Sequence, residues 1–167
     1  MDSKLIIGDS YSRREIHDFF SPNTNYVSGA GTWGLQGIVK IDLFKKDYVL
    51  FVTYGQKQGE HRFSDIINED GTLFWQSQPS QKISDKVIQE LINSKNNNIY
   101  LFLRRNKQEN YCYFGKLEYI CHDTKSNCPV HFKWKLKEIL DSGFNCKDII
   151  NKFNKVSSLR FNSSITL

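Results

Sequence analysis

The run YVLFVTY at residues 48–54 constrains the fold more than any other stretch of this chain. Its β-branched and aromatic residues are apolar on both alternating faces, which is typical of a strand buried on both sides of a sheet. The preceding segment, LQGIVKIDLF at residues 35–44, also has strand character, and a short turn at residues 45–47 joins the two. The segments predict adjacent strands, with 48–54 in a central position.

Five later segments complete the predicted sheet. An Asn-Glu-Asp-Gly sequence at residues 68–71 is a turn signal between the first two of them. The last segment alternates apolar and basic residues, which predicts one buried face and one basic face. The five segments are 61–67, 72–76, 99–105, 111–120 and 129–136.

Capping signals predict the helices. Ser12 and Glu15 have the spacing of a capping box, which predicts a helix over residues 13–20. Ser84 is predicted to cap a helix over residues 85–94, and a third short helix is expected near 147–153. With a glycine-rich loop at residues 21–34, the chain reads as an α+β domain. Its expected core is a curved, mostly antiparallel sheet or open β-barrel of about seven strands, flanked by two or three helices.

Composition is consistent with one domain over residues 1–167. The chain is 39% hydrophobic and 14% aromatic, so it can bury a core without disulfides. No run approaches the roughly 18 apolar residues of a membrane span, and the N-terminal apolar run is too short for a signal peptide. We therefore expect a cytoplasmic protein with four free cysteines and no cofactor. A zinc site would be the alternative, without a paired C-x-x-C motif to support it; its ligands would be Cys121, His122, Cys128 and His131.

The charge distribution favours a polyanionic partner. The net charge is +5; residues 1–80 carry 8 Lys/Arg and 10 Asp/Glu, whereas residues 81–167 carry 15 and 8. Basic side chains in such a region can neutralise DNA phosphates. Arg13 and Arg14 are either phosphate contacts or solvated side chains. The predicted contacts to the DNA backbone are Lys57, Arg62, Lys82, Arg104, Arg105, Lys133 and Lys135.

No catalytic motif stands out. The sequence has no P-loop, dinucleotide-binding fingerprint, G-x-S-x-G or H-E-x-x-H. The acidic residues Asp65, Glu69 and Asp70 lack the lysine-bearing partner motif of a metal-dependent nuclease. In contrast, residues 54–81 mix aromatic rings with amides and hydroxyls, the side chains that grip a flat polar ligand such as a nucleobase. The chain is therefore predicted to be a binding domain rather than an enzyme.

Six motifs in order resemble the SRA-like module of modification-dependent (type IV) restriction enzymes, which is found beside phospholipase-D-type nuclease and helicase domains. The resemblance covers about residues 8–140 and leaves a C-terminal helix and tail at 141–167. It implies an SRA- or PUA-like sheet that binds duplex DNA carrying 5-methylcytosine or 5-hydroxymethylcytosine and flips the modified base. The motifs are TWGLQGIV, YVLFVTYG, HRFSDIINEDGTLFWQSQ, NIYLFLRRN, YCYFGKLEYI and CPVHFKWKL.

The resemblance implies a base pocket around the Asn-Glu-Asp-Gly turn. Asp65 would accept a hydrogen bond from the exocyclic amine of cytosine, and Phe63 stands where the family commonly has tyrosine. Each candidate also has a structural alternative: Asp65 can pair with Arg62, and the aromatic residues can belong to the core or the strand ends. The other candidates for the pocket are Tyr54, Trp75, Trp33, Ser77 and Gln78.

Two rival functions stay open. The domain could read the sequence of duplex DNA without flipping a base, as B3-like restriction modules do. It could also be a protein-interaction or oligomerisation module of a restriction assembly. In each case the partners would be nuclease and helicase domains of the same protein or complex, and the cutting activity would belong to the nuclease.

Overall fold

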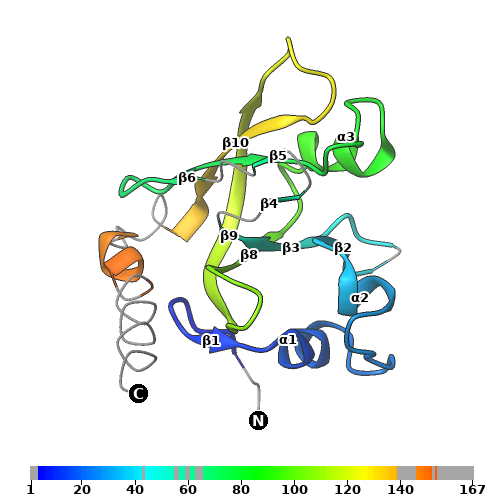
Figure 1. Cartoon of the computed structure of the whole chain (residues 1–167), viewed down its shortest axis with the longest axis vertical. Coiled ribbons are helices and arrows are strands. Elements are labelled where there is room, and N and C mark those ends of the chain that lie inside the picture. Colours follow the sequence, from blue (N-terminus) through cyan, green and yellow to red (C-terminus); the bar gives the residue numbers. More distant parts are fainter. Residues whose placement is uncertain are drawn as a thin grey trace.

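A single curved sheet organises the molecule (Figure 1). The computed structural model describes residues 4–42, 44–54, 57–58, 61–62, 66–138, 146–151 and 153, with the backbone alone for 57, 58, 61, 62 and 66. Seven strands follow the order β2-β3-β8-β9-β10-β7-β6, and β1 pairs with β9 as an eighth. The strands are β1 (Ser10–Tyr11), β2 (Ile38–Lys40), β3 (Tyr48–Thr53), β6 (Ile66–Ile67), β7 (Thr72–Gln76), β8 (Ile99–Arg104), β9 (Tyr111–His122) and β10 (His131–Leu136).

Smaller elements surround this sheet. A separate two-stranded ladder joins β4 (Lys57–Gln58) to β5 (His61–Arg62). The helices are α1 (Arg13–Phe20), α2 (Gly31–Leu35) and α3 (Lys86–Ile92), and residues 146–151 are also helical. None of the helices in the described part of the chain is long and apolar enough to cross a membrane.

The predicted central strand is confirmed. β3 lies between β2 and β8, and Val49 and Leu50, on its opposite faces, are both fully buried. Its pairing with β8 is parallel, whereas the other strand pairs of the described chain are antiparallel. A parallel pair needs a long crossover, and here residues 54–98, which include α3, provide it. The prediction of a mostly antiparallel, open sheet is therefore correct.

The sheet curls until its two ends come close without pairing as strands. Gln78 follows β7 near one end, and Gly37 precedes β2 at the other. A Cβ atom on Gly37 would lie only 3.5 Å from Nε2 of Gln78. One face of the strands from β3 to β7 contributes to a single apolar cluster, so that face is the inside of the curl.

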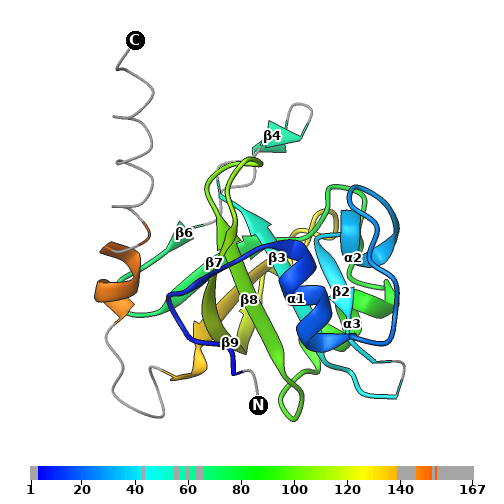
Figure 2. The ribbon, with the colours of Figure 1, turned by 90° about the horizontal axis from the view of Figure 1, so that it is seen from below.

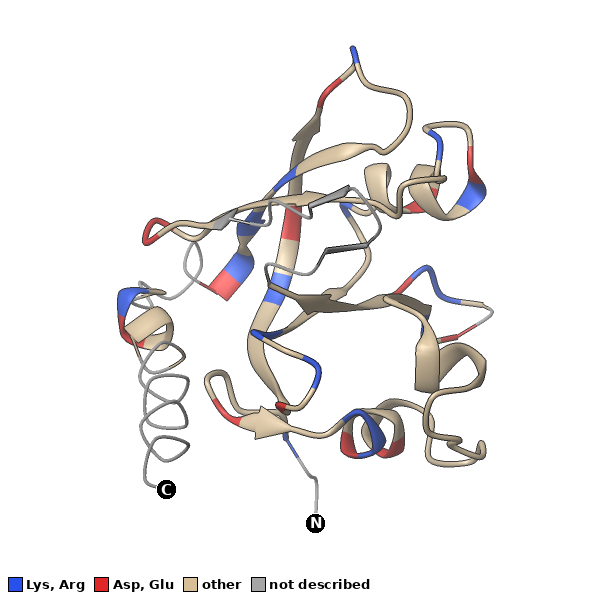
Figure 3. Ribbon diagram, viewed as in Figure 1, with Lys and Arg blue, Asp and Glu red and all other residues tan. Residues whose placement is uncertain are grey.

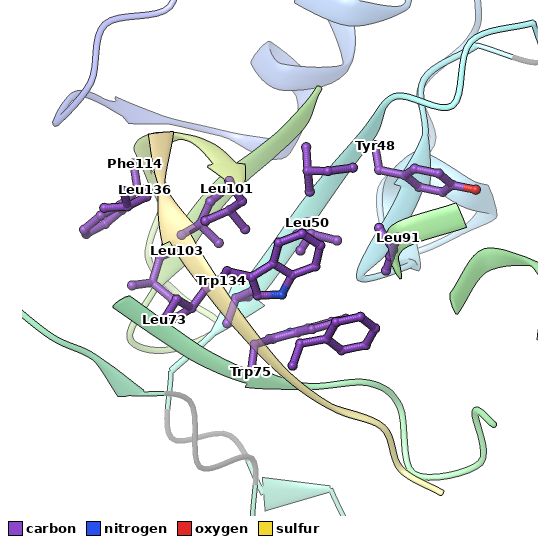
Figure 4. Packing of buried hydrophobic residues seen from close by; sticks show 14 of the residues in the cluster. Tyr48, Leu50, Leu73, Trp75, Leu91, Leu101, Leu103, Phe114, Trp134 and Leu136 are labelled. Atoms are coloured by element: carbon purple, nitrogen blue, oxygen red, sulfur yellow. The ribbon is translucent and has the colours of Figure 1, made fainter. Parts of the chain in front are cut away.

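The inside of the curl is filled by large side chains (Figure 4). Trp134 of β10 is fully buried and stacks on Phe132 at 5.4 Å between ring centroids. The predicted apolar face of β10 is confirmed, because Val130, Phe132, Trp134 and Leu136 are all 2% exposed or less. A second cluster lies on the outside of the curl, where α1 contributes Ile16 and β3 contributes Phe51 (Figure 2).

A buried carboxylate fastens α3 to the sheet. Glu90, only 7% exposed, accepts a hydrogen bond from the Tyr48 hydroxyl and two from Nζ of Lys40, at 3.2 and 3.3 Å. Burial alone would raise the pKa of Glu90, but the hydrogen bonds from Tyr48 and Lys40 and the charge of Lys40 lower it. Burial and the neighbouring Glu90 raise the pKa of the Tyr48 hydroxyl, which stays protonated as the donor.

The predicted helix start at Ser12 is confirmed in detail. Oγ of Ser12 accepts from the backbone N–H of Glu15 at 3.1 Å, and the Glu15 carboxylate accepts from the backbone N–H of Ser12 at 2.6 Å. The prediction for the next cap is wrong, because α3 begins after Asp85 rather than after Ser84. The Asp85 carboxylate accepts from the backbone N–H of Lys82 at 2.9 Å, so it closes the turn that leads into the helix.

Other boundaries also differ from the predictions, most clearly around α2 and β2. The loop predicted over residues 21–34 contains the start of α2, a helix of five residues that is too short to produce a periodic apolar pattern. The strand predicted over residues 35–44 is reduced to Ile38–Lys40, because the chain turns after Ile41, whose N–H still pairs with Asp47 at 3.0 Å. Asp42 closes that turn by accepting from the backbone N–H of Phe44 at 2.8 Å.

Replacing Gly34 by alanine is expected to destabilise the loop that leads into α2. A Cβ atom on Gly34 would lie 1.9 Å from the carbonyl oxygen of Val27, and backbone atoms cannot move aside cheaply. Such overpacking costs about 1–3 kcal/mol. Urea denaturation should show this loss for Gly34→Ala and a change below about 1 kcal/mol for Gly37→Ala, whose Cβ would meet ordinary contacts at 3.4 and 3.5 Å. Equal stabilities of the two variants would contradict the tight approach at Gly34.

Candidate nucleic-acid interface

The parallel strands β3 and β8 end together at one edge of the sheet, and we call residues 53–54 and 104–107 the β3–β8 rim. Thr53 is the register partner of Arg104, and the backbone N–H of Tyr54 donates to the carbonyl of Arg104 at 2.7 Å. Alternation along β3 puts Tyr54 on the inner face of the curl, in line with Leu50. Its side chain is 38% exposed, so the inner face ends at this rim in an accessible aromatic ring.

Arg104 turns to the outer side of the rim and is half-buried. Its Nε donates to Oγ1 of Thr53 at 2.9 Å, and its Nη1 donates to the carbonyl of Lys107 at 3.2 Å. The guanidinium lies 4.4 Å from the ring centroid of Tyr111. Burial and the positive charge of Arg13 lower the pKa of Arg104, although the group remains charged.

Arg13 reaches the same tyrosine from the start of α1. Its guanidinium lies 4.0 Å from the ring centroid of Phe51 and 5.7 Å from that of Tyr111. Nη1 donates to the carbonyls of Trp33 and Gln36 at 2.7 and 2.9 Å, and Nη2 donates to the Tyr111 hydroxyl at 3.4 Å. Arg13 therefore binds α1 to α2 and to the rim side of the sheet.

The β4–β5 ladder begins close to this rim. Lys57 follows Tyr54 by three residues, so their Cα atoms lie within about 11 Å of each other. The backbone register sets Lys57 opposite Arg62. β4 and the turn after β8 lie on the same side of the molecule (Figure 2), and Lys and Arg mark that turn and α1 (Figure 3). Two of the predicted DNA contacts thus share a ladder beside the rim.

Two other predicted base-pocket residues are more buried than Tyr54. Trp75 is 8% exposed and packs on Phe132 inside the curl, with ring centroids 5.4 Å apart. Trp33 lies under α1, stacked on Phe20 at 6.2 Å. Both rings pack against apolar neighbours, but each also lines a pocket: Trp75 one of about 320 Å³, and the partly buried Trp33 one of about 390 Å³. Phe63 and Asp65 lie outside the described residues.

Ser77 and Gln78 follow β7 at the seam between the ends of the curl. Ser77 is fully buried, and its hydroxyl accepts from the backbone N–H of Val130 at 2.9 Å. The backbone N–H of Gln78 donates to the side chain of Gln81 at 2.9 Å. These contacts fix the seam, and Tyr54 is the most exposed of the predicted pocket residues that the structure describes.

Most of the predicted DNA-backbone cations lie at or beside the rim or on the outer face of β10. Arg105 lies at the rim, with its guanidinium 5.4 Å from the ring of Phe153. On β10, Lys133 lies 5.8 Å from the ring of Phe74, and Lys135 lies 3.9 Å from the carboxylate of Asp70. Lys82 is exposed before α3. The predicted cations therefore lie on at least three segments: the rim, β10 and the residues before α3.

The alternative of a zinc site finds no support in the described part of the chain, where no group of three His, Cys, Asp or Glu side chains could hold a metal ion. Nδ1 of His122 shares a hydrogen bond of 2.6 Å with the Tyr119 hydroxyl. Sγ of Cys128 lies 2.8 Å from the carbonyl of Pro79. A pocket of about 320 Å³ does lie nearby, lined in part by Phe74, Gln76, His131 and Lys133.

The sequence did not point to Tyr111. It lies 98 residues from Arg13, and nothing local marks it as the ring against which both arginines pack. Arg104 and Arg13 were individually visible as basic residues beside a strand and a helix cap. Their meeting at one ring depends on the strand order β3-β8-β9, which places the start of β9 next to the end of β8.

Comparison with solved structures identifies the fold. The SRA domain of SUVH5, solved in complex with hemi-methylated CG DNA, superposes with a TM-score of 0.52 at 16% sequence identity, covering 80% of this chain and 90% of that chain. The same domain bound to fully hydroxymethylated CG DNA gives a TM-score of 0.50 at 16% identity, covering 81% and 91%. At this identity the likeness establishes the fold, so the predicted SRA-like architecture is confirmed.

Sequence comparison places the chain in a family. A comparison with curated proteins gives no significant match. The family described as "Domain of unknown function (DUF3427)" matches residues 5–144, which is most of the chain. The protein is therefore an SRA-fold member of the DUF3427 family.

Proposed function

We propose that this domain binds duplex DNA and recognises a modified cytosine. The observation that carries the proposal is the shared SRA fold, since the SUVH5 SRA domain that it resembles was solved in complexes with hemi-methylated and with hydroxymethylated CG DNA. The β3–β8 rim adds chemistry that suits this role. An exposed aromatic ring lies on the inner side of the rim, and guanidinium groups lie on its outer side.

The energetics assign different tasks to these groups. Extruding a base from the duplex costs a few kcal/mol, whereas burying one methyl group returns only about 0.8 kcal/mol. Stacking on an aromatic side chain contributes about 1–3 kcal/mol per base. Base flipping therefore requires the free energy of phosphate contacts and of stacking together. The modification then shifts the equilibrium between the stacked and the flipped base by a smaller amount.

Tyr54 is the proposed stacking partner, because its ring is accessible at the mouth of the curl. Asp65 remains the proposed acceptor for the exocyclic amine of cytosine, with Phe63 beside it. Trp75 and Ser77 are both buried. We propose that they form the inner wall of the pocket, behind the flipped base, and not its solvent-exposed entrance. Gln78 and Trp33 are proposed to support the pocket from the seam and from the α1 side.

We further propose that the domain is the specificity module of a modification-dependent restriction system. A reader without a catalytic site of its own directs a nuclease, so the cutting and any helicase activity would belong to other domains of the same protein or to partner subunits. The sequence motifs that resemble SRA-like restriction modules support this assignment.

The decisive measurement is the affinity for matched duplexes that carry cytosine, 5-methylcytosine or 5-hydroxymethylcytosine at one position. We expect tighter binding of a modified duplex and a steep fall of all affinities with salt. A fluorescent base analogue opposite the modified position should brighten if the base is flipped. Equal affinities without brightening would instead indicate a B3-like reader of sequence, and self-association without any DNA binding at low salt would indicate an interaction module.

Tyr54→Ala is expected to weaken binding of the modified duplex by about 1–3 kcal/mol, because the stacking surface is lost. Tyr54→Phe keeps the ring and should bind nearly as well as the wild type. The matched control is Phe44→Ala, which removes a ring that is 95% exposed. The assignment of Tyr54 would be wrong if Tyr54→Ala and Phe44→Ala had the same small effect in fluorescence anisotropy.

A further inference from the structure

Arg104 of the β3–β8 rim and Arg13 of α1 place their guanidinium groups beside one tyrosine, and neither has an acidic partner among the described residues. Tyr111 is 2% exposed, and the guanidinium groups of Arg104 and Arg13 lie 4.4 and 5.7 Å from its ring centroid. Neither arginine forms an ion pair with a carboxylate in the described part of the chain. Among the described residues, the two guanidinium groups contact ring faces, carbonyl oxygens and hydroxyl groups.

The hydrogen bonds leave Arg104 with spare donors. A guanidinium has five N–H groups, and Arg104 directs one from Nε to Thr53 and one from Nη1 to Lys107. Its remaining N–H groups have no acceptor among the described residues. The Thr53 hydroxyl accepts from Arg104, so its own hydrogen is still available to donate.

Electrostatics favour an anion at this place. Partial burial of a cation is costly, and a second cation nearby adds to the cost unless a negative charge compensates both. The pKa of Arg104 is lowered by burial and by Arg13, which is the direction expected when two cations face each other without an anion. An arginine fork matches the oxygens of a phosphate in bidentate geometry.

We infer that Arg104, with Thr53 and supported by Arg13 and Tyr111, forms a phosphate-binding site on the outer side of the β3–β8 rim. This inference rests on the proposed function and makes it more specific. The backbone hydrogen bond of 2.7 Å between Tyr54 and Arg104 couples the two sides of the rim. A strand that presents its base to Tyr54 on the inner side would have a phosphate held by Arg104 on the outer side.

The phosphate can come from a DNA strand or from a free phosphate group, and two arms separate these sources. In the first arm, the side-chain Nε–H signal of Arg104 is followed by NMR during titration with inorganic phosphate, with chloride at equal ionic strength as the reference. A saturable shift specific to phosphate is expected, and its absence would refute the site. Arg104→Gln lacks this signal and therefore serves only to assign it, whereas Lys95→Gln, which alters an exposed lysine beyond α3, should leave the shift intact.

The second arm measures DNA affinity against salt concentration. Arg104→Gln should reduce the slope of log affinity against log salt by about 1 and weaken modified and unmodified duplexes equally. Arg104→Lys, which keeps the charge but loses the fork, should keep the slope and part of the affinity. A salt slope unchanged by Arg104→Gln, in a variant that is folded by circular dichroism, would overturn a role for this site in holding the strand.

The two arms also separate this inference from the function on which it rests. A phosphate-specific shift of Arg104 in a protein that binds no DNA would keep the site and refute the proposed function. Discrimination between modified and unmodified duplexes, with neither a phosphate shift nor a change of slope in Arg104→Gln, would keep the proposed function and refute the site.

Discussion

Trp134→Ala is expected to lower the free energy of unfolding by about 3–5 kcal/mol, the usual cost of removing a buried aromatic side chain. Trp134 is fully buried at the centre of the curl, where it packs on Phe132 and Tyr119 with ring centroids 5.4 and 5.9 Å apart. The cavity would open where strands β7, β9 and β10 share their inner face, so the neighbouring rings could collapse into it only in part. Urea denaturation followed by circular dichroism would measure the loss.

Trp134→Phe is the matched control and should cost less than half as much. The indole Nε1–H is buried without a hydrogen-bond acceptor in the described part of the protein. Trp134→Phe removes this unsatisfied buried donor, which stabilises the folded protein. That gain offsets part of the free energy of unfolding that is lost with the smaller ring. A loss for Trp134→Phe as large as that for Trp134→Ala would show that the indole N–H has an acceptor after all.

Glu90→Ala is expected to destabilise the fold by about 3–5 kcal/mol, the cost of removing one partner of a buried ion pair. The variant would leave the Tyr48 hydroxyl buried without its acceptor and the Lys40 ammonium without its counter-charge. Glu90→Gln keeps an acceptor for Tyr48 and should lose less. Similar losses in the two variants would indicate that the negative charge of Glu90, rather than its shape or its acceptor oxygen, fastens α3 to the sheet.

The same carboxylate makes stability depend on pH. The pKa of Glu90 is lowered in the folded protein, so its contribution is present above the unfolded value, about 4.3, and is lost as the pH falls through the lower, folded value. The difference in stability between wild type and Glu90→Gln should therefore be largest near pH 7 and shrink below about pH 4. Urea denaturation of both proteins at pH 7 and below pH 4 tests this, and a constant difference would refute it.

Much of the fold was predictable because its strongest patterns are local. The apolar run at residues 48–54 identified the central strand, and the spacing of Ser12 and Glu15 fixed the start of α1. The alternation along 130–136 assigned both faces of β10. The parallel pairing of β3 with β8 was not visible, because it depends on a crossover of 45 residues, 54–98, rather than on any neighbouring turn.

The candidate site was predictable only in part. Tyr54 and Arg104 were identified from their types and their places at strand ends, and the structure brings them together through one backbone hydrogen bond. Burial of Trp75 and Ser77 could not be inferred, because residues beside a turn signal look alike whether they face solvent or the interior. Tyr111 was missed because its role arises from strand order.

The long-range pairing at the heart of the sheet has a consequence for how the chain reaches its native state. Each residue of β3 pairs with one located 51 positions further on, from Tyr48 with Ile99 to Thr53 with Arg104. Closing the loop between two such residues costs about 3 kcal/mol in chain entropy. This cost arises before the contacts between β3 and β8 can offset it. The hairpins β8–β9 and β9–β10 have much shorter connections, so we expect them to nucleate folding, with β3 docking late and the β3–β8 rim among the last parts to assemble.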